Sequence, residues 1–144
     1  MSLAMTRAER EAFLADTHVA IVGVGEEGRA PLVVPVWYAY ELGGVVRFVT
    51  GGASRKARLL RAARRASLCV QAESPPYRYV TVEGPVTIGT PEYERDVRAV
   101  ALRYLGPQMG EMYLAATAAE RDGSILVSLR PEHWLSVDYD KWAP

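Results

Sequence analysis

Short β-branched segments separated by turn residues are the feature of this 144-residue sequence that most limits its fold. Val19–Val24 precedes a turn at Glu26–Arg29, and Pro31–Tyr40 follows it, which predicts a β-hairpin. Pro31 and Pro35 lack the N–H that a central strand donates, so the second strand should be bulged or lack a neighbour on one side. Similar segments follow at Val45–Thr50, Ala66–Ala72, Tyr77–Ile88, Ser124–Leu129 and His133–Tyr139. Because turns rather than alternating helices join most of them, we expect an antiparallel, closed or nearly closed β-barrel of six or seven strands and not a parallel sheet.

Helices are predicted between some of these strands. Thr6 and Glu9 form a capping-box pattern ahead of a helix that ends near Ala15. Further helices are expected over 54–64, 91–106 and 107–121, while Gly84-Pro85 predicts a bend within its strand. The sequence shows no repeat or linker, so residues 1–144 are expected to form one domain, with residues 1–5 as a disordered leader.

The segment that follows Val45–Thr50 carries an unusual arrangement of charge. Thr50 ends the predicted strand, Gly51-Gly52 turns the chain, and Ser54 opens a helix whose first turns hold Arg55, Lys56 and Arg58. A helix N-terminus already has the positive end of the helix dipole and unpaired N–H groups, so added cations require compensation. An anionic ligand such as a phosphate would supply it.

Composition and motifs exclude several other functions. The 17 basic and 17 acidic residues cancel, which argues against general capture of nucleic acid or of an anionic membrane surface. The sequence has no apolar run of about 18 residues, the length that would predict a membrane span. Its single cysteine, Cys69, cannot form an intrachain disulfide, and the lack of disulfides is typical of cytoplasmic proteins. No metal site is expected, and the sequence lacks a P-loop and a nucleophile elbow. Gly23-x-Gly25-x-x-Gly28 lies in a predicted hairpin turn, so we interpret its match to a dinucleotide motif as coincidental.

Residues 33–70, with the core FVTGGASRKARLLRAARRASLCV, resemble the phosphate-binding half of the pyridoxamine-5′-phosphate-oxidase-like, FMN-binding split barrels. The later YRYVTVEGPVTI resembles another strand of that family, and the resemblance extends over about residues 6–139. Within the family, the sequence is most similar to the small flavin and deazaflavin oxidoreductases, many of which use coenzyme F-420.

The resemblance implies a six-stranded split barrel with short flanking helices that forms a homodimer, with the cofactor at the dimer interface. It assigns the phosphate end of the cofactor to the strand end and helix start, and the flavin or deazaflavin ring to the preceding strand. Tyr77 and Tyr79 would approach the same site from the partner subunit or line its mouth. The cofactor-binding residues implied in this way are Pro35, Val36, Trp37, Tyr38, Val49, Thr50, Ser54, Arg55, Lys56, Arg58, Tyr77 and Tyr79.

Two departures from the family pattern argue against vitamin B6 oxidation. True pyridoxamine-phosphate oxidases carry an Arg and a Lys on the strand that corresponds to Val33–Trp37, and they end in a W-x-x-x-R-L-type segment, whereas this chain has neither. We therefore expect an oxidoreductase that transfers hydride between F-420 or FMN and a small conjugated substrate. Water, Tyr38, Tyr79 and His133 are candidate proton donors, and the catalytic residues are left open.

Two alternatives remain open from the sequence. One is a protein that binds or stores a flavin, heme or tetrapyrrole without turnover. The other, less favoured, is a nucleic-acid-binding barrel, which the zero net charge opposes.

Overall fold

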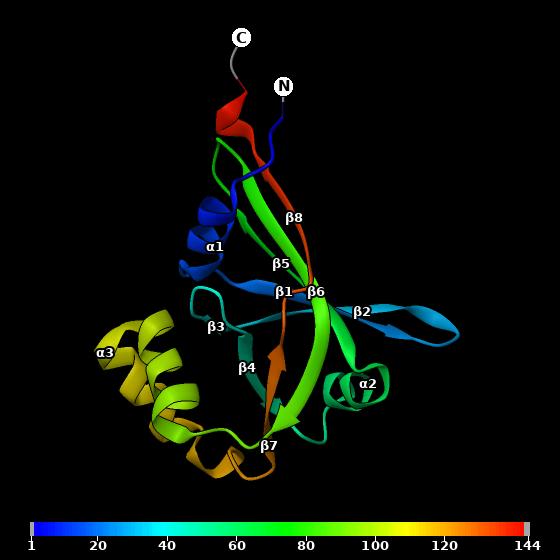
Figure 1. Cartoon of the computed structure of the whole chain (residues 1–144). Helices are drawn as coiled ribbons and strands as arrows, with labels where there is room; N and C mark the ends of the chain where they lie inside the picture. Colours follow the sequence, from blue (N-terminus) through cyan, green and yellow to red (C-terminus); the bar gives the residue numbers. More distant parts are fainter. Residues whose placement is uncertain (1, 143–144) are drawn as a thin grey trace.

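The computed structural model describes residues 2–142, which form antiparallel strands with helices on the outside (Figure 1). The strands are β1 (Ala20–Glu26), β2 (Arg29–Val36), β3 (Ala39–Tyr40), β4 (Val46–Gly51), β5 (Arg65–Ala72), β6 (Arg78–Gly89), β7 (Ser124–Leu129) and β8 (His133–Asp138). The α-helices are α1 (Arg7–Ala15), α2 (Arg55–Ala63) and α3 (Ala99–Ala116). A π-helical segment, η1 (Tyr93–Arg98), leads into α3, and short 3-10 turns lie at η2 (Ala118–Glu120) and η3 (Tyr139–Lys141).

The strands form one open sheet in the order β2-β1-β5-β6-β7-β4-β3, with β8 paired to β6. The structure has eight strands within residues 2–142, whereas the family resemblance implied six. No ladder in this part of the chain joins the two ends of the sheet. Those ends, β2 and β3, are instead joined by the chain itself through Trp37 and Tyr38. The predicted strand Pro31–Tyr40 is divided at this link, and β2 pairs only with β1 on the sheet path, as its prolines predicted.

Hydrogen bonds from Tyr104 of α3 explain why the strand is interrupted. The backbone N–H of Tyr38 donates to the Tyr104 hydroxyl at 3.1 Å, and that hydroxyl donates to the His18 carbonyl at 2.6 Å. The Tyr38 side chain is fully buried and its hydroxyl donates to the Leu14 carbonyl at 2.6 Å. The link therefore turns into the core and bonds to helices instead of continuing a ladder.

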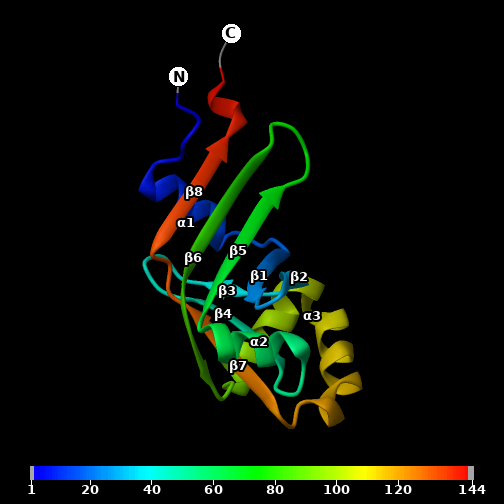
Figure 2. The same cartoon turned by 90° about the vertical axis from the view of Figure 1, so that its right-hand side faces the viewer.

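Strand β6 connects the two halves of the sheet, as the two views in Figures 1 and 2 show. One edge pairs with β5, whereas the other pairs with β8 over Arg78–Glu83 and with β7 over Val86–Gly89. The change of partner falls at Gly84, the position where a bend was predicted. A side chain at Gly84 would overlap the backbone carbonyl of Arg130, so only glycine allows this close approach.

Local signals for the helices are confirmed. Thr6 and Glu9 form the capping box of α1, Ser54 caps α2, and Gly106 (φ 80°) interrupts α3 before Pro107. No helix among residues 2–142 is both long and apolar enough to cross a membrane.

The expectation of a disordered leader is wrong for the residues next to α1. The Leu3 carbonyl accepts a hydrogen bond from Asp138 N–H at 2.8 Å, and Met5 is buried in the core. The N-terminal segment thus packs along the end of β8, while Met1 lies outside the described residues.

Candidate functional site

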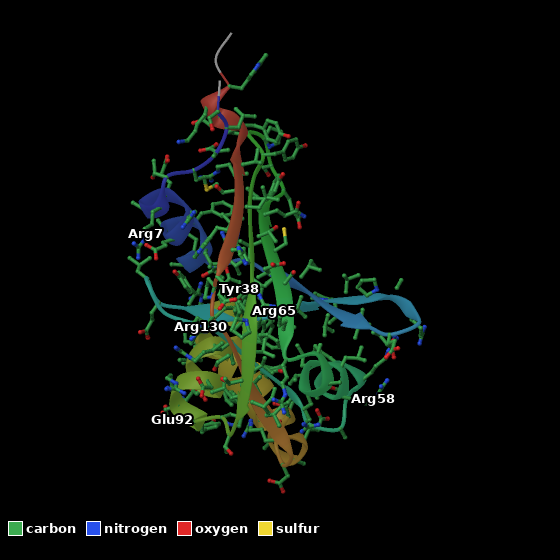
Figure 3. All side chains as sticks on the ribbon, turned by 45° about the vertical axis from the view of Figure 1, so that its right-hand side comes forward. Arg7, Tyr38, Arg58, Arg65, Glu92 and Arg130 are labelled. Atoms are coloured by element: carbon green, nitrogen blue, oxygen red, sulfur yellow. The ribbon has the colours of Figure 1, made fainter. Side chains whose placement is uncertain are left out.

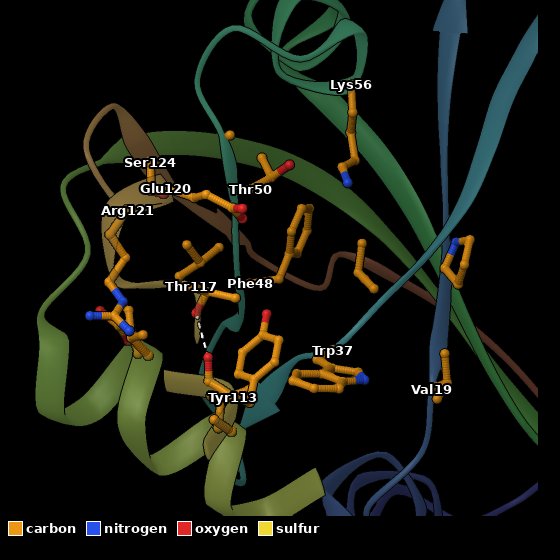
Figure 4. Close-up of a pocket in the computed structure, with 18 residues that line it drawn as sticks. Val19, Trp37, Phe48, Thr50, Lys56, Tyr113, Thr117, Glu120, Arg121 and Ser124 are labelled. Atoms are coloured by element: carbon orange, nitrogen blue, oxygen red, sulfur yellow. Dashed lines mark hydrogen bonds between the residues drawn. The ribbon is translucent and has the colours of Figure 1, made fainter. Parts of the chain in front are cut away.

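A cavity of about 720 Å³ lies between the helical segment η1–α3–η2 and the strands β2 and β4 (Figure 4). The end of β2 and its link contribute Pro35, Val36 and Trp37, and β4 contributes residues 48–51. Lys56 enters from α2, and the helical side contributes Val97, Val100, Ala101 and Tyr113. The volume is in the range of small-molecule and cofactor sites.

The cations at the start of α2 divide into two groups. Arg55 and Arg58 both bond to Glu26 at the end of β1, with N–O distances of 2.6 and 3.4 Å. Figure 3 shows Arg58 extending from α2 toward the β1–β2 hairpin. The hydrogen bond from Arg55, together with that from Arg58, lowers the pKa of the Glu26 carboxyl below its ordinary value. The compensation that the sequence required for these two arginines therefore comes from within the chain.

Lys56 is arranged differently, because its side chain points into the cavity (Figure 4). No carboxylate among residues 2–142 lies within ion-pair distance of it. Partial burial lowers the pKa of its ammonium, as expected for a cation that loses water without gaining a partner. Lys56 is therefore the basic group of α2 that is positioned to meet an anion in the cavity.

Thr50 and Gly51 complete the polar end around Lys56. Thr50 is buried at the end of β4 and lines the cavity. No heavy atom lies within 4 Å of the place where a Cβ of Gly51 would stand, so the backbone here is open to a ligand. Ser54, by contrast, uses its hydroxyl locally: it accepts from Ala57 N–H at 3.1 Å and donates to the Gly51 carbonyl at 2.7 Å.

Aromatic side chains form the opposite end of the cavity, its floor in Figure 4. The Trp37 ring stacks on Tyr104, with centroids 5.0 Å apart and an interplanar angle of 5°. The ring centroid of Tyr113 lies 5.3 Å from that of Trp37, and the two ring planes are inclined by 54°. Trp37 and Tyr113 line the cavity, and Tyr104 supports Trp37 from behind. The floor is thus a broad apolar surface with fixed ring orientations.

Two acidic side chains also line the cavity. Asp96 of η1 is buried and accepts hydrogen bonds from Arg95 and from Glu92 N–H, all at 2.8–2.9 Å, with Arg47 at 3.4 Å. Burial alone would raise the pKa of Asp96, but these partners outweigh it and lower the pKa, so the group stays ionised and paired. Glu120 of η2 is exposed and has no ion-pair partner among residues 2–142.

The cavity brings together six of the twelve residues assigned from the sequence: Pro35, Val36, Trp37, Val49, Thr50 and Lys56. Tyr38 lies in the core, Ser54 caps its helix, and Arg55 and Arg58 bond to Glu26. Tyr77 and Tyr79 lie near the β5–β6 turn and do not line the cavity of this protomer. Their predicted approach from a partner subunit stays a prediction.

The helical side of the site was missed by sequence reasoning. Tyr113, Asp96 and Glu120 line the cavity, whereas none of the candidate proton donors Tyr38, Tyr79 and His133 does. The available signal was weak, since a tyrosine in a helix with Met109 and Met112 reads as an ordinary amphipathic helix. Only the tertiary structure, in which η1 contacts β4 and leads into α3, reveals its place.

Comparisons with known proteins identify the fold. Residues 5–138 match the family model described as pyridoxamine 5′-phosphate oxidase, and no curated protein matches the sequence. A conserved hypothetical protein from Mycobacterium tuberculosis superposes with a TM-score of 0.77 at 23% identity, over 95% of this chain and 87% of its own. An FAD and heme binding protein from Mycobacterium smegmatis superposes with a TM-score of 0.71 at 19% sequence identity, over 96% of this chain and 74% of its own. An F-420 reductase superposes with a TM-score of 0.63 at 20% sequence identity, over 87% of this chain and 94% of its own.

These structural likenesses establish a shared fold, and the family match covers nearly the whole chain. It also spans the residues that build the cavity, from the end of β2 through α2 to η2. The chain belongs to the pyridoxamine 5′-phosphate oxidase-like split-barrel family.

Proposed function

We propose that this protein is an oxidoreductase that binds F-420 or FMN and transfers hydride between that cofactor and a small conjugated organic substrate. The observation that carries the proposal is a half-buried Lys56, without an ion-pair partner in the described part of the chain, at one end of a cavity whose other end is aromatic. A flavin-type cofactor would place its anionic phosphate at the polar end and its planar ring against the aliphatic side chains of the cavity, which leaves the aromatic end for a conjugated substrate.

The residues of the cavity fit such a cofactor. Lys56 would hold the phosphate by a charged hydrogen bond, and Thr50 and the open backbone of Gly51 would add polar contacts. Pro35, Val36 and Val49 offer apolar contacts for the ring. The cofactor supplies the hydride chemistry when bound, while the chain orients the ring and excludes water.

The side chains at the end of strand β2 argue against pyridoxamine-phosphate oxidation. The part of β2 that lines the cavity presents Pro35 and Val36, followed by Trp37, and none of these can hold a second phosphate by charge. Arg55 and Arg58, the nearby arginines of α2, bond to Glu26 instead. Among the basic residues that line the cavity, Lys56 has no hydrogen-bond or ion-pair partner within residues 2–142, whereas Arg121 donates to the Leu114 carbonyl.

A homodimer that covers the cofactor is part of the proposal. Large apolar side chains remain exposed along β1, β2 and β8, including Ile21, Val33 and Leu135. Burying such a surface against a second copy would stabilise the pair. Light scattering on the purified chain should give twice the 15.9 kDa mass of one protomer, and a monomer at micromolar concentration would remove this part.

Parallel titrations with FMN and F-420 test the cofactor. We expect at least one to bind with micromolar or tighter affinity, and failure of both would refute the proposal. Lys56→Ala should weaken binding by about 10- to 100-fold, the effect of losing a charged hydrogen bond. Arg58→Ala is the matched control: it removes a cation two residues away that bonds to Glu26, and should change affinity by less than about twofold.

A second experiment separates the enzyme from a cofactor carrier. The loaded protein is reduced anaerobically and then mixed with a quinone or an enone. Rapid reoxidation supports the oxidoreductase. A cofactor that binds tightly but remains reduced with every acceptor supports the non-catalytic binding or storage protein instead.

A further inference from the structure

Tyr113 brings a polar hydroxyl to the aromatic floor of the cavity. The phenol projects from α3 toward the middle of the cavity, beside Trp37 (Figure 4). No hydrogen bond joins its hydroxyl to another group among residues 2–142, whereas the hydroxyls of Tyr38, Tyr40 and Tyr104 all bond within the protein. The hydroxyl is free to meet a ligand.

Tyr113 is positioned by a contact of its ring with Trp37 and by hydrogen bonds at its backbone. Its ring packs at a tilt against Trp37, which is held in turn by the stack on Tyr104. At its backbone, the Tyr113 carbonyl accepts hydrogen bonds from the Thr117 hydroxyl at 2.8 Å and from Thr117 N–H at 3.0 Å. The hydroxyl is therefore presented at a defined place above an apolar floor, which is the arrangement that orients a planar ligand.

We propose that the floor formed by Trp37 and Tyr113 is the substrate subsite, that it takes a planar, apolar ring bearing a conjugated carbonyl, and that the Tyr113 hydroxyl donates a hydrogen bond to this carbonyl oxygen. The inference rests on the proposed function, since it assigns the polar end around Lys56 to the cofactor. Val97, Val100 and Ala101 add aliphatic surface to the lining of the cavity. The floor formed by Trp37 and Tyr113 carries no charged side chain, so it favours an uncharged ring over an ionic one.

Two ligands of nearly equal shape test the hydrogen bond. 2-Acetylnaphthalene is a planar ring with a conjugated carbonyl, and 2-ethylnaphthalene is the matched compound without the oxygen. Their affinities for the purified protein are measured by equilibrium dialysis, with no cofactor added, for the natural chain and for Tyr113→Phe. Tyr113→Phe keeps the ring and removes only the hydroxyl.

We expect both compounds to bind the natural chain, and Tyr113→Phe to weaken 2-acetylnaphthalene about fivefold while it leaves 2-ethylnaphthalene within about twofold. Tyr93→Phe is the matched control, because Tyr93 has the same exposed fraction of 42% in the adjoining η1 but does not line the cavity. It should change neither affinity.

The subsite is refuted by any of three results: neither compound binds, both affinities fall equally in Tyr113→Phe, or Tyr93→Phe has the same effect as Tyr113→Phe. These outcomes are independent of the cofactor titrations. Binding of FMN or F-420 without the Tyr113 effect removes the subsite and leaves the proposed function. If Tyr113→Phe selectively weakens 2-acetylnaphthalene but the protein binds neither FMN nor F-420, the proposed function is removed and the ligand-binding floor remains.

Discussion

Replacing Gly84 by alanine tests the junction at which β6 changes from β8 to β7. The added Cβ would overlap the Arg130 carbonyl, which is backbone and cannot move alone. Hydrogen bonds hold the backbone on either side of Gly84. The Glu83 carbonyl accepts a hydrogen bond from Glu132 N–H at 2.9 Å, and the Pro85 carbonyl accepts one from Arg130 N–H at 3.0 Å. To make room, the chain at Arg130 must move away and strain both bonds.

The expected cost follows from these contacts. Overpacking typically costs about 1–3 kcal/mol, and each weakened hydrogen bond adds about 1 kcal/mol. Gly84→Ala should therefore lower the free energy of unfolding by about 3–5 kcal/mol, which corresponds to a fall in Tm of about 10–20 °C for a chain of this size.

Urea unfolding at fixed protein concentration, followed by circular dichroism, measures this change. Gly89→Ala is the matched control: Gly89 ends the same strand, has no heavy atom within 4 Å of its Cβ position, and should stay within about 0.5 kcal/mol of the natural chain. The reasoning is refuted if Gly84→Ala is as stable as Gly89→Ala, because the sheet would then tolerate a side chain at the junction.

Three further predictions concern the link, the helical wall and the cation. Tyr104→Phe removes the hydroxyl partner of the Tyr38 N–H and the His18 carbonyl while it keeps the ring, so urea unfolding should show a loss of about 1–3 kcal/mol; an unchanged midpoint would contradict the hydrogen-bonded link. Asp96 has a pKa below the usual 3.8 in the folded protein, so its stabilisation is complete above that value and is lost as pH falls through the lower folded pKa. Asp96→Asn should accordingly be less stable than the natural chain at pH 7, with a gap that closes in acid; a gap independent of pH would show that the charge is not responsible. Burial lowers the pKa of Lys56, so FMN or F-420 affinity should fall as pH rises through that lowered value, whereas Lys56→Arg should keep its affinity; equal falls in both proteins would assign the titration to another group.

Local elements were predicted well because their signals lie within a few residues of each other. The capping box at Thr6 and Glu9, the Ser54 cap and the interruption at Gly106 depend on contacts over one or two helical turns. The strand prolines likewise predicted a strand with one free edge, and β2 ends the sheet. The division into β2 and β3 was not predicted, because it depends on Tyr104, 66 residues beyond Tyr38.

The candidate site could be predicted only in part, for the same reason. The end of β2, the end of β4 and the start of α2 lie close in sequence and carry a recognisable pattern, so Trp37, Thr50 and Lys56 were named in advance and line the cavity. Tyr113 and Glu120 come from a segment without such a pattern and reach the cavity only through the packing of α3.

The sequence by itself determined that a basic helix start follows a strand and a glycine turn, and that its cations need negative partners. It could not determine which partner each cation would take. In the tertiary structure Glu26, brought over by the β1–β2 hairpin, bonds to Arg55 and Arg58, while Lys56 points into the cavity and has no partner within residues 2–142. The physical reason is that helix initiation depends on neighbouring residues, whereas charge pairing depends on distances between segments that only the folded sheet brings together.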